Sequence, residues 1–166
     1  QNMKNFRMTK VNSETLAIIL AAGLGTRMES NIPKVMHKIG GLPLINHVLQ
    51  SLAKAGIKKK IVVVGAGMQE VVETVKPVPT IVQNSQLGTG HAVKSALKKM
   101  SNPEKNILVI FGADPLIRPQ TLKKLLLRKG QNDAPIIVAL GFKSNNPGNY
   151  GRLIIDQKKK LKGIVE

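Results

Sequence analysis

A glycine-rich loop follows the first apolar run of the chain and carries residues that could bind a nucleotide. It reads Leu20-Ala21-Ala22-Gly23-Leu24-Gly25-Thr26-Arg27, and its small residues would let the backbone approach a base or a phosphate closely. Exposed backbone N–H groups bind oxyanions, Arg27 adds a bidentate cation, and Lys34 adds a point charge. The spacing fits neither G-x-G-x-x-G, because Met28 takes the place of the last glycine, nor the Walker pattern. The loop alone leaves a nucleotide site and an ordinary glycine-rich turn equally open.

An amide-rich loop farther along the chain, Gln83-Asn84-Ser85-Gln86-Leu87-Gly88-Thr89-Gly90-His91, could recognise a base. Side-chain amides such as that of Gln83 can read the donors and acceptors along a base edge. Gly88 and Thr89 lie where a helix is expected to begin, and N–H groups at a helix N-terminus favour anions. An ordinary loop with Thr89 as the helix N-cap explains the same residues, with His91 simply starting the helix.

A lone acidic residue, Asp114, follows another apolar run in the segment Phe111-Gly112-Ala113-Asp114-Pro115. A carboxylate at a strand end can hold Mg²⁺ between phosphate groups. The alternative is an aspartate that only turns the chain before the proline. The three histidines show no metal-ligand spacing, and His47 fits the apolar stripe of a helix, so we expect a structural role for it.

The elements that position these loops follow from the apolar pattern. Short runs rich in β-branched residues predict buried strands at residues 16–20, 61–64, 80–82, 107–111 and 136–140. Helical spacing predicts helices at residues 43–55, 68–75, 89–100 and 120–129, and two late strands at residues 152–156 and 161–165 resemble a hairpin. Alternating strands and helices predict a Rossmann-like α/β fold, with a mostly parallel sheet flanked by helices. Ligands of such folds bind at the carboxyl ends of the strands, where the candidate loops lie.

Composition limits the classes of function. The net charge is +17, from 26 basic and 9 acidic residues, which would attract polyanions. The lysines occur mainly at expected helix ends and strand starts, however, and only three Phe and one Tyr could stack on bases, which argues against nucleic acid as the partner. The absence of cysteine excludes disulfides and thiolate metal sites and suits the cytoplasm, where we expect the chain to act. No apolar run approaches the ~18–20 residues of a membrane span, so no membrane partner is expected.

Several segments together resemble the nucleotidyltransferases that activate sugar 1-phosphates. The segment from Leu20 to Met28 with Pro33-Lys34-Val35 resembles their nucleotide loop, and Gln86-Leu87-Gly88-Thr89-Gly90-His91-Ala92 is a further, rather specific block. Tyr150-Gly151-Arg152 and Gly163-Ile164-Val165-Glu166 resemble sugar-facing segments. The strongest likeness is to the uridylyltransferase domain of the bacterial bifunctional enzyme that makes UDP-N-acetylglucosamine. We therefore expect residues 1–15 to be a flexible tail and residues 16–166 to be part of such a domain, incomplete at its C-terminus.

The resemblance implies a Mg²⁺-dependent reaction of UTP with N-acetylglucosamine 1-phosphate, which gives UDP-N-acetylglucosamine and pyrophosphate. It implies that the uridine is surrounded by Leu20, Ala21, Ala22, Gly23, Gln83, Gly88 and Thr89. Arg27 and Lys34 would act in catalysis by neutralising the triphosphate and the leaving pyrophosphate. Gly151 and Glu166 would contact the sugar, and Asp114 would bind the metal.

One departure from the family pattern concerns the metal ligand. The family has Gly-Asp-x-Pro-Leu, but here the order is Gly112-Ala113-Asp114-Pro115, so the acid comes one residue late. One residue in a strand reverses the side-chain direction, which would turn Asp114 away from the metal unless a bulge restores its aim. Because the family also has a second metal ligand beyond the matched segments, we expect little or no turnover by this chain.

The sequence leaves other functions open. They are a nucleotidyltransferase for another sugar or alditol phosphate, a degenerate fragment without catalysis, and a basic nucleic-acid-binding protein. Homo-oligomer formation is left open as well.

Overall fold

The structure is a computed structural model that describes residues 14–23, 25, 28, 30–100, 104–131, 133, 135–158 and 160–165. They belong to two compact units, one ending at Pro135 and the other beginning at Ile136, and each unit is described by itself. Arg27 and Glu166, both predicted site residues, lie outside the described residues, as do residues 1–13 of the predicted tail. Thr15 of that tail is the first residue of the first strand.

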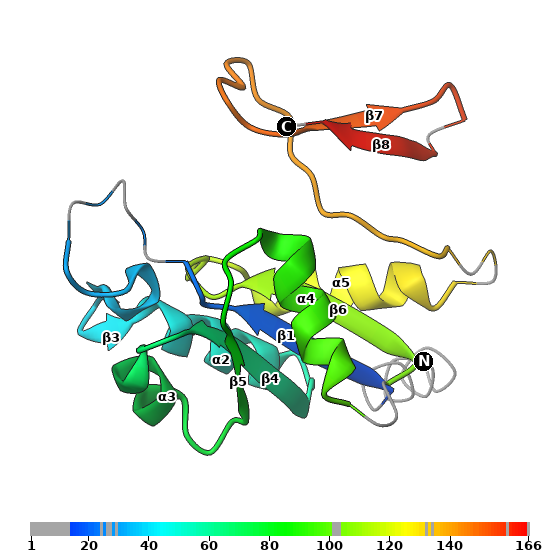
Figure 1. Cartoon of the computed structure of the whole chain (residues 1–166). Coiled ribbons are helices and arrows are strands. Elements are labelled where there is room, and N and C mark those ends of the chain that lie inside the picture. Colours follow the sequence, from blue (N-terminus) through cyan, green and yellow to red (C-terminus); the bar gives the residue numbers. More distant parts are fainter. Residues whose placement is uncertain are drawn as a thin grey trace. The chain divides into compact units, whose positions relative to one another are not determined.

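The first unit is built on a four-stranded parallel sheet (Figure 1). Its strands are β1 (Thr15–Leu20), β4 (Lys59–Gly65), β5 (Thr80–Gln83) and β6 (Asn106–Phe111). They lie in the order β5-β4-β1-β6, and each neighbouring pair is parallel. The central strand β1 is an almost uninterrupted apolar run, because both of its faces are covered.

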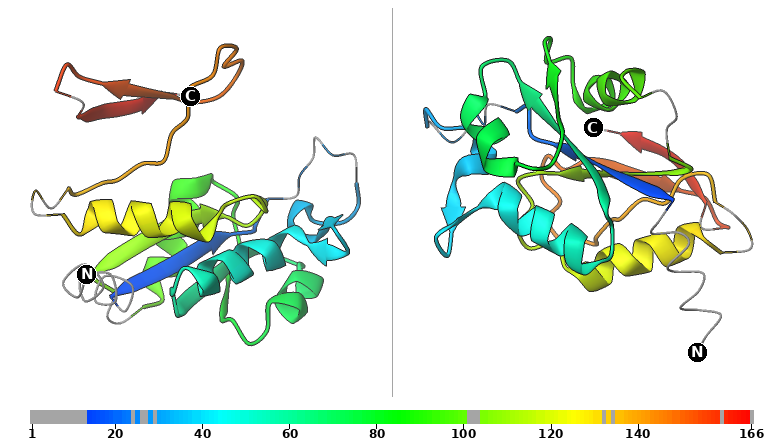
Figure 2. Two further views of the ribbon diagram at one scale, coloured as in Figure 1. Left: turned by 180° about the vertical axis from the view of Figure 1, so that it is seen from behind. Right: turned by 90° about the horizontal axis from the view of Figure 1, so that it is seen from below.

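Helices cover both faces of this sheet, as Figure 2 shows for α4 on one side and for α2 and α5 on the other. The helices are α2 (Leu44–Lys54), α3 (Gln69–Val75), α4 (Thr89–Lys98) and α5 (Pro119–Lys129). One core joins α2, α3 and α5 to Ile19, Val62 and Ile110, and the other joins α4 to Ile18 and Val63. The predicted Rossmann-like α/β fold is therefore confirmed for this unit.

Local sequence explains where the helices begin and end. In α2, the buried side chains of Leu44, Ile45, Val48 and Leu52 recur at helical spacing, with Pro43 just before the helix and Gly56 just after it.

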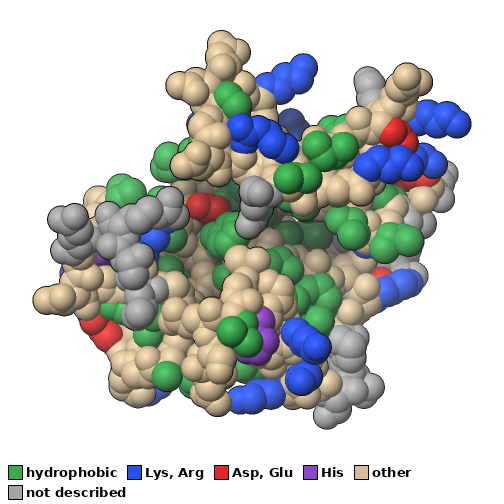
Figure 3. Space-filling model, turned by 45° about the horizontal axis from the view of Figure 1, so that its top comes forward, with side chains coloured by type: hydrophobic (Ala, Val, Ile, Leu, Met, Phe, Trp, Pro, Cys, Tyr) green, Lys and Arg blue, Asp and Glu red, His purple; other side chains and the backbone are tan. Residues whose placement is uncertain are grey.

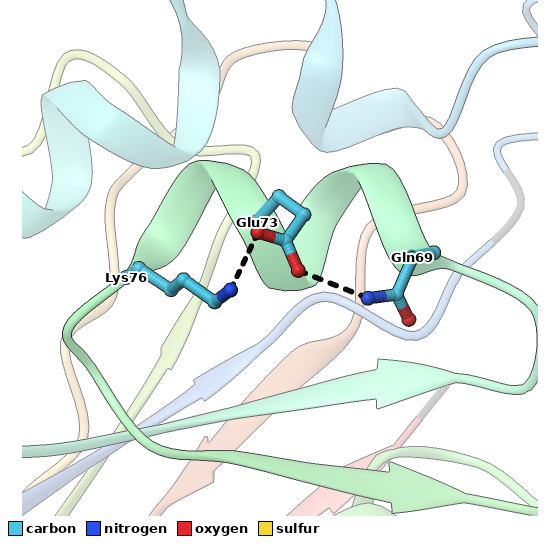
Figure 4. A network of polar contacts seen from close by, with 3 residues as sticks. All are labelled: Gln69, Glu73 and Lys76. Atoms are coloured by element: carbon cyan, nitrogen blue, oxygen red, sulfur yellow. Dashed lines mark hydrogen bonds and ion pairs between the residues drawn. The ribbon is translucent and has the colours of Figure 1, made fainter.

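The short helix α3 is supported on its exposed side by three polar residues (Figure 4). Gln69 Nε2 and Lys76 Nζ donate hydrogen bonds to the Glu73 carboxylate at 3.0 and 2.6 Å, and the bond from Lys76 lowers the pKa of Glu73. The described helices include none that is long and apolar enough to cross a membrane.

Between β1 and α2 the chain forms small elements that the apolar pattern did not predict. They are the 3-10 helix η2 (Lys34–Met36) and the two-residue strands β2 (Lys38–Ile39) and β3 (Leu42–Pro43). Gly40 and Gly41 form the turn between these strands with positive φ angles of 57° and 79°, which glycine adopts readily. The Gly-Gly pair was the available signal for this hairpin.

The second unit contains an antiparallel hairpin of β7 (Arg152–Ile155) and β8 (Leu161–Val165), as the sequence predicted. Asp156 shapes the turn by accepting hydrogen bonds from the backbone N–H groups of Lys158 and Lys160.

The prediction of a strand at residues 136–140 was wrong. That segment has no regular secondary structure, and Ile136 is 90% exposed. An apolar run forms a strand only where a neighbouring strand satisfies its backbone groups, and no described strand pairs with this segment.

Candidate active site at the carboxyl edge of the sheet

The order of the strands places two of the candidate loops side by side. The chain passes from β1 to β4 and β5 on one side and then returns to β6 on the other side of β1. Loops that leave a parallel sheet at such a reversal border a crevice, which is the usual ligand site of open α/β sheets. Leu20 and Phe111 are paired at the ends of β1 and β6, and Gly112 N–H donates to the Leu20 carbonyl at 2.9 Å. The glycine-rich loop and the turn at Asp114 therefore start from adjacent strand ends.

The glycine-rich loop leaves β1 buried and then opens to solvent. Ala21 is 1% exposed and its N–H donates to the Val63 carbonyl at 2.8 Å, which anchors the loop to β4. A Cβ atom on Gly23 would meet no described residue within 4 Å. Gly25 differs, because its φ is +68° and a Cβ atom there would lie 2.8 Å from Lys34 Cβ. Lys34 is thus packed directly against the loop.

The turn after β6 brings Asp114 toward the same loop. Removal of water around the Asp114 carboxyl raises its pKa, and the positive charge of Lys34 acts against this rise. A Cβ atom on Gly112 would lie 3.2 Å from Val35 Cγ1, so the segment that carries Lys34 also packs on the end of β6. Lys34 and Asp114 are therefore close enough to interact electrostatically.

The amide-rich loop joins this group from the end of β5. Gln86 Nε2 donates to the Ala22 carbonyl at 2.8 Å, which ties this loop to the glycine-rich loop. Gln83 is buried, and its Nε2 lies 3.0 Å from His91 Nδ1 and 3.4 Å from the Gly88 carbonyl oxygen. Gly88, not Thr89, is the N-cap of α4, with φ of 92° and no side-chain cap. Without a capping side chain from Gly88, the first N–H groups of α4 are suited to bind water or an anion.

Asp114 can supply one oxygen ligand to a metal. Among the described residues, no three His, Asp or Glu side chains come together as a metal cluster. Mg²⁺ is commonly held by one or two carboxylates together with phosphate oxygens and water, so a single carboxylate beside a triphosphate fits its chemistry. Ala113, at the place where the family pattern has its acid, packs instead against the hydrophobic core.

The first unit thus brings together most of the predicted site residues, namely Leu20, Ala21, Ala22, Gly23, Lys34, Gln83, Gly88, Thr89 and Asp114. Gly151 belongs to the second unit, directly before β7. There the Tyr150 and Phe142 rings meet edge to face at 5.2 Å, and Arg152 donates to the Gly148 carbonyl at 2.9 Å. The roles of Gly151, and of Arg27 and Glu166 outside the described residues, stay predictions.

Four supporting residues were not predicted as site residues. Gln86 ties two loops together, Gly25 makes room for Lys34, and His91 contacts the Gln83 amide. The fourth is Gly65, where a Cβ atom would lie 3.1 Å from the Ala22 carbonyl oxygen. Gln86 and His91 belong to the segment Gln86-Leu87-Gly88-Thr89-Gly90-His91-Ala92, which resembles the family, so a signal for them was present in the sequence. For Gly25 and Gly65, only the folded structure shows which atoms lie beside them.

Comparisons with known proteins show the family to which the chain belongs. The model of the MobA-like NTP transferase domain matches residues 17–163. The chain is 44% identical over 156 residues to the bifunctional protein GlmU of Paramagnetospirillum magneticum, which covers 93% of this chain and 34% of that protein. The expected resemblance to the uridylyltransferase domain of GlmU is thereby confirmed, although the chain spans about a third of the length of the curated relatives it matches.

Two solved structures are similar as well. UDP-glucose pyrophosphorylase complexed with UDP-glucose matches with a TM-score of 0.73 at 21% identity, over 92% of this chain and 68% of that one, and supports the fold. HddC from Yersinia pseudotuberculosis complexed with GMP-PN matches with a TM-score of 0.68 at 28% identity, over 91% and 68% of the two chains. Together with the family match across residues 17–163, these findings show that the chain belongs to the family of MobA-like NTP transferase domains.

Proposed function

We propose that this chain binds UTP for transfer of its uridylyl group to N-acetylglucosamine 1-phosphate, the reaction that gives UDP-N-acetylglucosamine and pyrophosphate, and that the displaced Asp114 keeps its turnover low. The observation that carries this proposal is the hydrogen bond from Gln86 to the Ala22 carbonyl, which joins the two loops expected to enclose the nucleotide. The 44% identity to GlmU supports the choice of uracil and of an amino-sugar phosphate.

The base and the ribose would lie on the loop of small residues. The small residues Ala21, Ala22 and Gly23 would allow a planar ring to approach the backbone closely, and no described residue would meet a Cβ atom on Gly23 within 4 Å. Gln83 would hydrogen-bond the base edge, and the N-terminus of α4 at Gly88 and Thr89 would face the ribose and phosphates.

The triphosphate would be held by cations. Lys34, and Arg27 by the family resemblance, would neutralise the negative charge that develops on the phosphates and on the leaving pyrophosphate. An oxygen of the sugar phosphate attacks the α-phosphorus as the bond from that phosphorus to the bridging oxygen of pyrophosphate breaks. The protein forms no covalent intermediate and contributes position and charge. Gly151 and Glu166 would contact the sugar.

Asp114 would hold Mg²⁺ together with the phosphate oxygens. When bound, the metal would supply charge neutralisation and orientation of the phosphates. The half-exposed carboxylate beside Lys34 fits one such ligand.

A second candidate is a nucleotide-binding chain without catalysis. It is favoured by Ala113, which packs against the core where the family pattern has its acid, so that Asp114 comes one residue later. Both candidates bind UTP, and they differ in turnover.

The experiment measures binding and turnover on the same purified chain. Calorimetry with UTP, CTP and GTP in the presence of Mg²⁺ should give the tightest binding for UTP, and release of pyrophosphate with N-acetylglucosamine 1-phosphate should show catalysis.

Lys34→Ala should weaken UTP binding by about tenfold or more, because a charged hydrogen bond contributes about 1.5–3 kcal/mol. Lys54→Ala, at the exposed end of α2, is the matched control. UTP binding without turnover would support the second candidate, and preference for GTP over UTP would overturn both.

A further inference from the structure

The side-chain amide of Gln83 is held in one orientation by two acceptors at the start of α4. Gln83 is the last residue of β5 and is 3% exposed. Its Nε2 lies 3.4 Å from the Gly88 carbonyl oxygen and 3.0 Å from His91 Nδ1. A carbonyl oxygen can only accept, so the contact with Gly88 requires the NH₂ end of the amide to face α4. His91 Nδ1 then accepts as well, which places the imidazole proton on Nε2.

The other end of the amide, Oε1, is available to a ligand. None of the residues that the structure describes donates a hydrogen bond to it. Among the described residues, the buried side-chain atoms without a hydrogen-bond partner are His37 Nε2 and Asn46 Oδ1, and Gln83 Oε1 is not one of them. The bond from Gln86 to the Ala22 carbonyl brings the loop expected to hold the base beside the segment that begins at Gln83.

We infer that His91 is a positioning residue that fixes the Gln83 amide so that Oε1 accepts from a base with a ring N–H, favouring uracil over cytosine. This inference rests on the proposed nucleotide site. N3 of uracil carries a hydrogen and donates, whereas N3 of cytosine accepts, so a fixed carbonyl oxygen discriminates between them. An amide free to turn would offer its NH₂ group to cytosine and lose this discrimination.

The test compares UTP with CTP on three forms of the chain. Leucine at position 91 keeps a similar volume but has no acceptor, whereas asparagine places Oδ1 on Cγ, where histidine has Nδ1. Calorimetry in the presence of Mg²⁺ should show that His91→Leu reduces the preference for UTP over CTP about tenfold, and that His91→Asn restores most of it. His47→Leu is the matched control, because His47 contacts the Ile39 carbonyl at 2.9 Å from α2 and should leave the preference unchanged.

The outcomes separate this inference from the proposed function. A folded His91→Leu variant that keeps the wild-type preference overturns the role of His91 and leaves the nucleotide site standing. A wild-type chain that does not bind UTP overturns the proposed function itself. Should His91→Leu fail to fold, ¹⁵N NMR of the wild-type imidazole decides: a proton on Nε2 supports the inference, and a proton on Nδ1 contradicts it.

Discussion

At the scale of single residues, the site combines a cation and an acid that influence each other. Lys34 packs against Gly25, and its charge acts on the Asp114 carboxyl. The sequence predicted both residues from their types and their places after strands. It did not show that Asp114, one residue out of register with the family pattern, would still lie near Lys34. That outcome depends on the turn after β6, in which the Asp114 N–H donates to the Phe111 carbonyl at 3.4 Å.

The raised pKa of Asp114 predicts a pH-dependent stability. Its folded pKa lies above the unfolded value of about 3.9, so folding favours the protonated form and the charged form costs stability at neutral pH. Asp114→Asn should therefore be more stable than the wild type at pH 7, by less than about 1 kcal/mol because solvent screens this half-exposed group. The advantage should shrink as the pH falls toward 4. Denaturant unfolding at both pH values checks this, and a variant that is less stable at pH 7 would contradict it.

At the scale of elements, the site depends on how loops meet at strand ends. The strand order and the covering helices were predictable, because buried runs and helical stripes follow directly from side-chain spacing. The short segment η2 was not, because three residues carry no readable period. It nevertheless determines where Lys34 lies, through its contacts with Gly25 and Gly112. Gly65, at the end of β4, likewise leaves room for the Ala22 carbonyl and Gln86 in the neighbouring loops, a contact that no local pattern reveals.

Two glycine substitutions separate backbone strain from the placement of Lys34. Gly25→Ala and Gly41→Ala both put a Cβ on a backbone with positive φ, 68° and 79°, and each should cost about 1 kcal/mol of stability. Gly25→Ala also forces a Cβ against Lys34, whereas a Cβ on Gly41 would meet no described residue within 4 Å. We expect Gly25→Ala alone to weaken UTP binding in calorimetry. Equal weakening by Gly41→Ala would show that loop strain, and not contact with Lys34, controls the site.

At the scale of the whole molecule, the sequence predicted the class of fold but misread one strand. The apolar run at residues 136–140 has the composition of a buried strand, but composition does not reveal whether a partner strand is available. The net charge of +17 raised nucleic acid as a partner. Within the first unit, the described lysine and arginine side chains on the face shown in Figure 3 are interspersed with side chains of other kinds. Some basic side chains of this unit are paired with acids, as in Lys59–Glu104 and Arg128–Asp133.

This distribution of charge predicts how the chain responds to salt. Any binding to duplex DNA should be non-specific and should fall by about a thousandfold or more between 50 and 200 mM salt, as counterion release requires. UTP binding, which engages few cations, should weaken far less over the same range. Fluorescence anisotropy with labelled DNA and calorimetry with UTP provide the comparison. DNA binding that persists at 200 mM salt would favour a nucleic-acid function.

The central claim is that the loops after β1 and β5 enclose UTP at the carboxyl edge of the sheet. Its most direct test is a titration of the ¹⁵N-labelled chain with UTP and Mg²⁺, followed by the backbone amide signals. We predict saturable shifts at Ala22, Gly23 and Gly88, with β8 little affected. Unchanged signals at these residues while UTP binds elsewhere, or does not bind at all, would contradict the claim.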